Sequence, residues 1–121
     1  MVDSIRVLEQ LMAVIEDRRV NPPPHSYTTT LFEGGVARIG AKITEEAAEV
    51  VEAAAEVEAA AEATPEQRAH VVHEAADLIY HLFVLLGHQR IPLSEVTAEL
   101  ARRTGISGLD EKAARSAPDS P

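Results

Sequence analysis

The segment 42–52 constrains the fold of this chain most, because its residue pattern is that of the middle of a helix. Carboxylates and small apolar residues alternate there at three- and four-residue steps, and the segment contains neither Gly nor Pro. At about 100° per residue from Glu45, the apolar residues of the longer stretch 36–57 centre near ~160°. Glu46 then falls near ~100° and Glu49 near ~40°, at and just beyond the border of the apolar stripe. A border carboxylate is partly desolvated and can face a neighbouring helix, so this acidic pair is a candidate site.

A second acidic pair lies downstream, in a helical pattern that runs from about residue 65 to residue 89. Glu74 borders the apolar face of this helix, Asp77 is displaced further toward the polar side, and His81 lies between them. If the two helices pack antiparallel, the four carboxylates can converge on one cation. Oxygen-only ligands suit a hard ion, Mg²⁺ or Mn²⁺.

The rest of the chain also predicts helices. We expect a first helix capped by Asp3 or Ser4 and ending near Arg19, and a short helix over 27–33. The Gly34-Gly35 pair then breaks the chain before a long helix over 36–62. Thr64 and Gln67 form a capping-box pattern at the start of the next helix, and the last helix covers 95–103. No segment shows strand alternation, so the prediction is an all-α domain over 1–104, with residues 105–121 as a tail of the same domain that we expect to be mobile.

Composition narrows the classes of function. The net charge is −9 and no basic stripe exists, which argues against a nucleic-acid partner. The N-terminus lacks a signal-peptide pattern, and the longest apolar run, residues 82–86, is far shorter than a membrane span of about 20 residues. We therefore expect a cytoplasmic protein with no membrane partner. The pattern over 78–86 is apolar on most faces, which indicates a central helix or a subunit contact, and we expect the protein to form an oligomer.

The acidic, basic and histidine residues also have simpler interpretations than a metal site. An acidic pair at i, i+3 is often no more than a solvated helix face, and Arg38 and Lys42 are placed as ordinary helix-surface partners of acids one turn away. A lone histidine such as His81 is more often packed than ligating, and His70, His73 and His88 read as surface residues, with His73 a candidate substrate contact. A di-iron bundle needs Glu-x-x-His on two helices, and the sequence contains no such motif.

Glu-Glu-x-x-Glu at residues 45–49, followed by Glu-x-x-Asp at residues 74–77, resembles the MazG-like all-α nucleotide pyrophosphohydrolases. Within them, the chain is similar to the phosphoribosyl-ATP pyrophosphatase family of histidine biosynthesis over about residues 4–115. Four further segments carry this narrower resemblance: residues 26–28, 34–42, 77–82 and 107–112.

The resemblance implies a Mg²⁺-dependent homodimer, a helical bundle that hydrolyses phosphoribosyl-ATP to phosphoribosyl-AMP and pyrophosphate. It also implies that the four carboxylates bind the metal and that Glu45 orients the attacking water or binds a second ion. The candidate substrate contacts are Arg38, Lys42, His73, His81, Lys112 and Arg115. Two alternatives stay open at this point: a MazG-like enzyme for other nucleoside triphosphates, and a non-enzymatic helical interaction module.

Overall fold

The computed structural model of the chain describes residues 3–105, so Lys112, Arg115 and the rest of the predicted tail lie outside the described residues. Four helices follow one another along the chain, and the described residues contain no strand. The all-α prediction is therefore confirmed. The helices are α1 (Ser4–Val20), α2 (Tyr27–Ala59), α3 (Pro65–His88) and α4 (Leu93–Thr104).

Local signals in the sequence account for the helix ends. The side chain of Asp3 accepts a hydrogen bond from the backbone N–H of Arg6 at the start of α1. Thr64 and Gln67 exchange two hydrogen bonds, of 2.9 and 3.1 Å, at the start of α3, which is the predicted capping box. Gly105 ends α4 in the left-handed conformation, with φ 61°.

A break within α2 separates its first two turns from the long remainder. Gly35 has φ 65° and ψ −161°, a backbone conformation that no helical residue adopts, so the predicted pair of helices is present and joined end to end. The predicted end of the long helix, Glu62, was wrong by a few residues, since Ala60 is already extended and caps the helix. Alanine favours helix at these positions, but the chain must reverse between α2 and α3.

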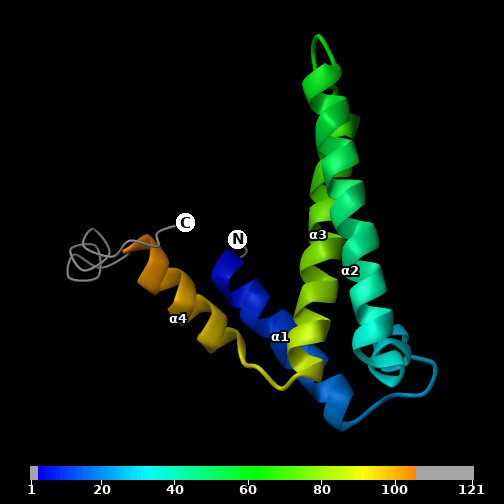
Figure 1. Cartoon of the computed structure of the whole chain (residues 1–121), viewed down its shortest axis with the longest axis vertical. Helices are drawn as coiled ribbons and strands as arrows, with labels where there is room; N and C mark the ends of the chain where they lie inside the picture. The colour runs from blue at the N-terminus through cyan, green and yellow to red at the C-terminus, as the bar shows by residue number, and fades with distance from the viewer. Residues whose placement is uncertain (1–2, 106–121) are drawn as a thin grey trace. The chain divides into compact units, whose positions relative to one another are not determined.

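The α2–α3 hairpin is the main structure of the first of two compact units, which ends at Arg90. Because only residues 60–64 connect them, the two helices run antiparallel, and Figure 1 shows them side by side along their length. The helix α1 packs against the end of the hairpin that is remote from this connection. The buried apolar side chains of this unit are Ile15, Leu31, Ile39, Ala53, Phe83 and Val84.

Much apolar surface stays uncovered in the single chain. On the apolar face of α1, Ile15 is fully buried, while Val7, Leu8 and Val14 are exposed. On the hairpin, Val51 and Val72 are 67% and 68% exposed. The reason is that two helices and the short α1 cannot enclose both sides of a long hairpin, so an amphipathic pattern does not guarantee a covering partner within the same chain.

The helix α3 also has the length and apolar content of a membrane span, although the longest unbroken apolar run in it is short. One such helix is weak evidence for a span, because core helices of globular proteins have the same composition. The second compact unit begins at Ile91 and contains α4. Within α4, Glu99 accepts hydrogen bonds from Arg102 and Arg103, and no residue of the helix is buried.

Candidate metal centre

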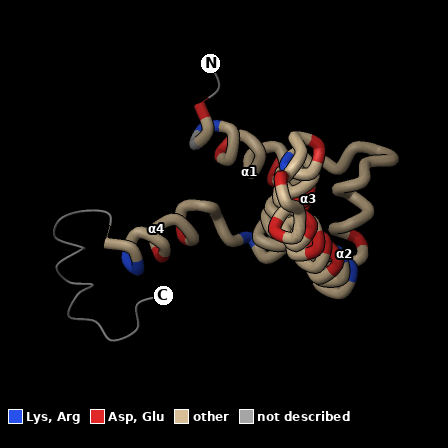
Figure 2. The backbone as a smooth tube through the Cα atoms, turned by 90° about the horizontal axis from the view of Figure 1, so that it is seen from above, with Lys and Arg blue, Asp and Glu red and all other residues tan. Residues whose placement is uncertain are grey.

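The first acidic pair and the second pair meet across the α2–α3 hairpin. Glu46, Glu49 and Glu74 each offer a carboxylate oxygen, and these oxygens all lie within 4.8 Å of one another. Acidic residues recur along both helices of the hairpin, where Figure 2 marks their backbone positions in red. The sequence analysis predicted that the carboxylates converge only if the two helices pack antiparallel. The short connection between α2 and α3 produces this packing.

Asp77 joins this group through Glu74. Ligand atoms of His73, Glu74 and Asp77 also lie within 4.8 Å of one another, so Glu74 belongs to both sets. Nε2 of His73 is 3.4 Å from Oδ2 of Asp77. The four carboxylates predicted as ligands therefore form one continuous cluster, with Glu74 at its centre.

The two central carboxylates are more buried than their helical angles suggested. Glu46 is 5% exposed and Glu74 is 8% exposed, whereas both were expected at the border of an apolar stripe. Each carboxylate lies close to the opposite helix. The projection of a single helix cannot show burial by a second helix. One oxygen of each, Oε2, is buried and has no hydrogen-bond partner among the described residues.

Burial and the neighbouring acids shift the pKa of Glu46. Burial, together with the neighbouring charge and hydrogen bond of Glu49, raises the pKa of Glu46 to about 7, and Asp77 and Glu74 contribute in the same direction. A divalent cation would supply the missing partner to the two buried oxygens and offset the repulsion among the acids. The residues present therefore fit a hard metal ion.

Basic residues lie beside the cluster. Nζ of Lys42 is 3.4 Å from Glu45 and 3.7 Å from Glu46, so it makes the ordinary one-turn helix contacts that the sequence left open. Glu45 itself is exposed. Arg38 is exposed as well, and its stem lies so close to Gly34 that a Cβ at Gly34 would be 2.5 Å from the Cβ and Cδ of Arg38.

The histidines divide into buried and exposed groups. His81 is 4% exposed, and its two ring nitrogens bind the backbone oxygen of Asp77 and the hydroxyl of Tyr27. His70 is exposed, as the sequence indicated, and its Nε2 is 3.3 Å from Oε1 of Glu74. The four-residue step from His70 to Glu74 is the signal that could have found this contact, whereas no periodicity pointed to Tyr27.

Comparison with known proteins decides the family. The phosphoribosyl-ATP pyrophosphohydrolase family profile matches residues 8–104. The chain belongs to this family. A phosphoribosyl-ATP pyrophosphatase of Rhodopirellula baltica is 49% identical over 117 residues, which cover 97% of this chain and 92% of that protein. Proteins of the same name from Novosphingobium aromaticivorans and Paramagnetospirillum magneticum are 46% and 41% identical, and the matches cover 91% and 95% of this chain and 94% and 97% of those proteins.

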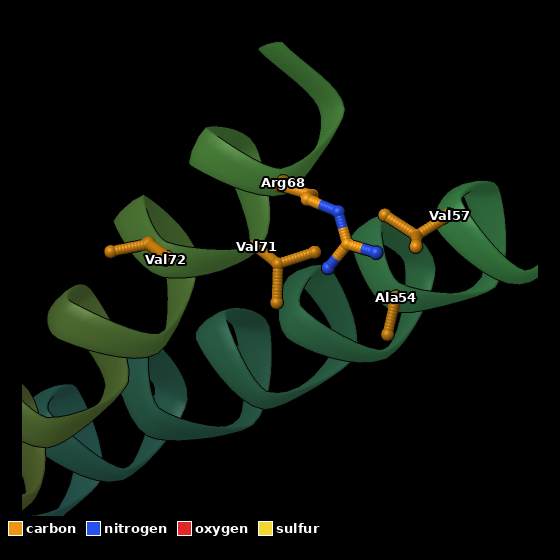
Figure 3. Close-up of a pocket in the computed structure, with 5 residues that line it drawn as sticks. All are labelled: Ala54, Val57, Arg68, Val71 and Val72. Atoms are coloured by element: carbon orange, nitrogen blue, oxygen red, sulfur yellow. The ribbon is translucent and has the colours of Figure 1, made fainter. Parts of the chain in front are cut away.

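The phosphoribosyl-ATP pyrophosphohydrolase match covers most of α1 and all of α2, α3 and α4, and therefore the whole carboxylate cluster. A separate pocket lies on the hairpin closer to the connection between α2 and α3. Figure 3 shows its lining, in which the Arg68 side chain extends between Val71 and Val57 toward Ala54, while Val72 lies to one side. Of the predicted site residues that the structure describes, none lines this pocket, so it is distinct from the metal centre.

Proposed function

We propose that this protein hydrolyses the α–β phosphoanhydride of phosphoribosyl-ATP and releases phosphoribosyl-AMP and pyrophosphate, a step of histidine biosynthesis. The observation that carries the proposal is the convergence of Glu46, Glu49 and Glu74 across the hairpin, with two buried oxygens that lack partners. The family membership and the names of the relatives support the choice of substrate.

Glu46, Glu49, Glu74 and Asp77 would hold Mg²⁺, or Mn²⁺ in its place. Such an ion would neutralise charge on the phosphate oxygens and would activate water for the hydrolysis. The protein's own contribution is position: two carboxylates from each helix are fixed by the packing of the hairpin. Burial of Glu46 and Glu74 excludes bulk water from one side of the cluster.

Glu45 has a different place in this proposal. It lies next to Glu46 in the chain, but its side chain is exposed and paired with Lys42 rather than turned into the cluster. This position suits orientation of the attacking water or a second, outer ion better than a share in the buried ion. When a substrate phosphate binds Lys42, Lys42 would release Glu45, and the Glu45 carboxylate could then orient the water or bind the outer ion.

Substrate binding needs cations, because the acidic cluster alone repels a triphosphate. We assign this role to Arg38 and Lys42 at the edge of the hairpin and to Lys112 and Arg115 of the tail. His73 is well exposed beside Asp77 and is open to the substrate, whereas His81 has both ring nitrogens engaged and would act through the residue that it holds.

We further propose that the active form is a cytoplasmic homodimer with no nucleic-acid or membrane partner. The uncovered side chains Val51, Val72, Ile79 and Leu82 on the hairpin form a surface that a second copy would bury. In this assembly residues 1–104 form the helical domain, and residues 105–121 belong to the same domain.

Product analysis tests the function directly. The purified protein is incubated with Mg²⁺ and phosphoribosyl-ATP, and in parallel with ATP, GTP, CTP, UTP and their deoxy forms. We expect stoichiometric phosphoribosyl-AMP and pyrophosphate from the first and little pyrophosphate from the others. Faster hydrolysis of a common triphosphate would contradict the substrate assignment, and no pyrophosphate from any of them would contradict the enzyme.

A further inference from the structure

Tyr27 is held in a defined orientation at the start of α2. Its hydroxyl is 2.8 Å from Nε2 of His81 on α3, and the two rings meet edge to face at 87°. Its ring also stacks on Tyr80, with a centroid distance of 6.4 Å. The break at Gly35 makes this placement possible, because the first turns of α2 need not continue the line of the long helix. Even so, Tyr27 is 49% exposed, so part of its side chain is open to a ligand.

The direction of the hydrogen bond follows from the other side of the His81 ring. Nδ1 of His81 is 2.7 Å from the backbone oxygen of Asp77, and a carbonyl oxygen only accepts. Nδ1 therefore carries the hydrogen, and in the neutral imidazole Nε2 presents a lone pair. The hydroxyl of Tyr27 then donates its only hydrogen to Nε2, and the phenol oxygen has only lone pairs left to present to a ligand.

This phenol oxygen lies close to the candidate active site. Partial burial raises the pKa of Tyr27, and the charges of Lys42, Glu46 and Arg38 also act on this group. The carbonyl that anchors His81 belongs to Asp77, a member of the carboxylate cluster. Tyr27 is thus an acceptor beside a site that otherwise presents carboxylates and cations.

We propose that Tyr27 is a specificity-determining residue that accepts a hydrogen bond from a donor on the nucleoside part of the substrate, and that His81 is the positioning residue that holds it. Phosphate oxygens are acceptors and find no hydrogen on Tyr27, so the recognised group is a sugar hydroxyl or the exocyclic nitrogen of the base. This inference rests on the proposed function, because it concerns the substrate of the same site.

The test combines a Tyr27→Phe variant with substrate analogues. Steady-state kinetics are measured for phosphoribosyl-ATP and for analogues that lack the 2′-hydroxyl or the 3′-hydroxyl of the adenosine ribose, or carry oxygen in place of the exocyclic nitrogen. We expect one analogue to raise KM of the natural protein by roughly tenfold with kcat little changed. We expect Tyr27→Phe to raise KM for the full substrate by about the same factor and to lose discrimination against that one analogue. The analogue that behaves in this way distinguishes sugar from base.

His81 is tested by its own pair of variants. His81→Leu should reproduce the KM of Tyr27→Phe, and the double variant should be no worse, since both break the same contact. His81→Gln offers one donor and one acceptor and should restore part of the loss. Tyr80→Phe is the matched control: it removes a hydroxyl from the same ring stack, where Tyr80 bonds Thr28, and should lower stability without a change in KM.

Several results overturn the inference. An unchanged KM in Tyr27→Phe overturns it, and so does a rise that is equal for the full substrate and every analogue, because the hydroxyl would then recognise none of the replaced groups. If His81→Leu does not fold, the Tyr27→Phe series decides the question without it. A natural protein that is inactive on phosphoribosyl-ATP contradicts the proposed function, which is a different result from an active protein that is indifferent to Tyr27.

Discussion

Glu46 on α2 and Glu74 on α3 face each other across the hairpin, and each has a buried carboxylate oxygen without a hydrogen-bond partner among the described residues. Two adjacent buried acids destabilise a fold unless a proton or a cation compensates them. The two buried acids therefore lower the free energy of unfolding of the metal-free protein.

Removal of one ligand charge should abolish most of the activity. We expect Glu49→Gln or Asp77→Asn to lower kcat at least about 100-fold while the helical circular dichroism signal is retained. The loss of one ligand charge would weaken the binding of the metal ion and misplace the attacking water. Glu58→Gln removes an exposed acid from the same helix as Glu49 and should change little. Activity like that of the natural protein in both ligand variants would refute the metal assignment.

The stability of the metal-free protein should depend on pH through Glu46. Its pKa is about 7 in the folded protein against a reference value of 4.5, so between these values the folded state binds more protons than the unfolded state. The free energy of unfolding therefore falls as pH rises from about 4.5 to about 7, by an amount on the order of 2 kcal/mol. Urea unfolding in a chelator at pH 5 and pH 7.5 measures this fall. Glu46→Gln should flatten it, and an equal slope in both proteins would contradict the assignment to Glu46.

The uncovered apolar side chains predict self-association. Light scattering at low micromolar concentration should report about twice the chain mass of 13.0 kDa. Leu82→Glu places a charge on an exposed apolar position of α3 and should shift the protein toward monomer. Gln89→Glu adds the same charge at the exposed end of that helix and serves as the control. A stable, active species of the single-chain mass in the natural protein would be incompatible with the dimer.

Two glycines of α2 should respond in opposite directions to alanine. Gly35 has φ 65° and ψ −161°, a region that is nearly confined to glycine and costs an L-residue about 1–3 kcal/mol, so Gly35→Ala should lower the free energy of unfolding by about that amount. Gly40 is helical, and a Cβ there would meet nothing within 4 Å, so Gly40→Ala should raise stability by about 0.5–1 kcal/mol. Denaturant unfolding measures the stability of both variants. A Gly35→Ala protein as stable as the natural one would contradict the strained conformation at the break in α2.

The tail, which lies outside the described residues, stays a prediction from sequence. Truncation after Thr104 should leave helicity and dimerisation nearly unchanged but raise KM at least several-fold, because Lys112 and Arg115 no longer reach the anionic substrate. Lys112→Ala should give a smaller rise that shrinks at high salt. Unchanged kinetic constants in the truncated protein would show that the tail has no part in binding.

The sequence by itself determined most of the helical frame. Asp3, Ser26, Thr64 and Gly105 mark helix ends through hydrogen bonds and backbone conformations that depend only on neighbouring residues, and Gly35 marks the break in the same way. It also identified the two acidic pairs, because i, i+3 spacing places both members on one side of a helix. Helix caps and helical spacing depend on residues close in sequence, so they can be predicted from the sequence. The family resemblance added the expected roles in metal and substrate binding.

Only the tertiary structure decided how deeply the site is buried and what supports it. Burial of Glu46 and Glu74 depends on the opposite helix, and the projection of one helix places both at a border. The contact of His81 with Tyr27, 54 residues away, depends on side chains of two helices meeting in space. The same holds for the apolar face of α1: periodicity marks a face as apolar, but only packing determines whether another element covers it.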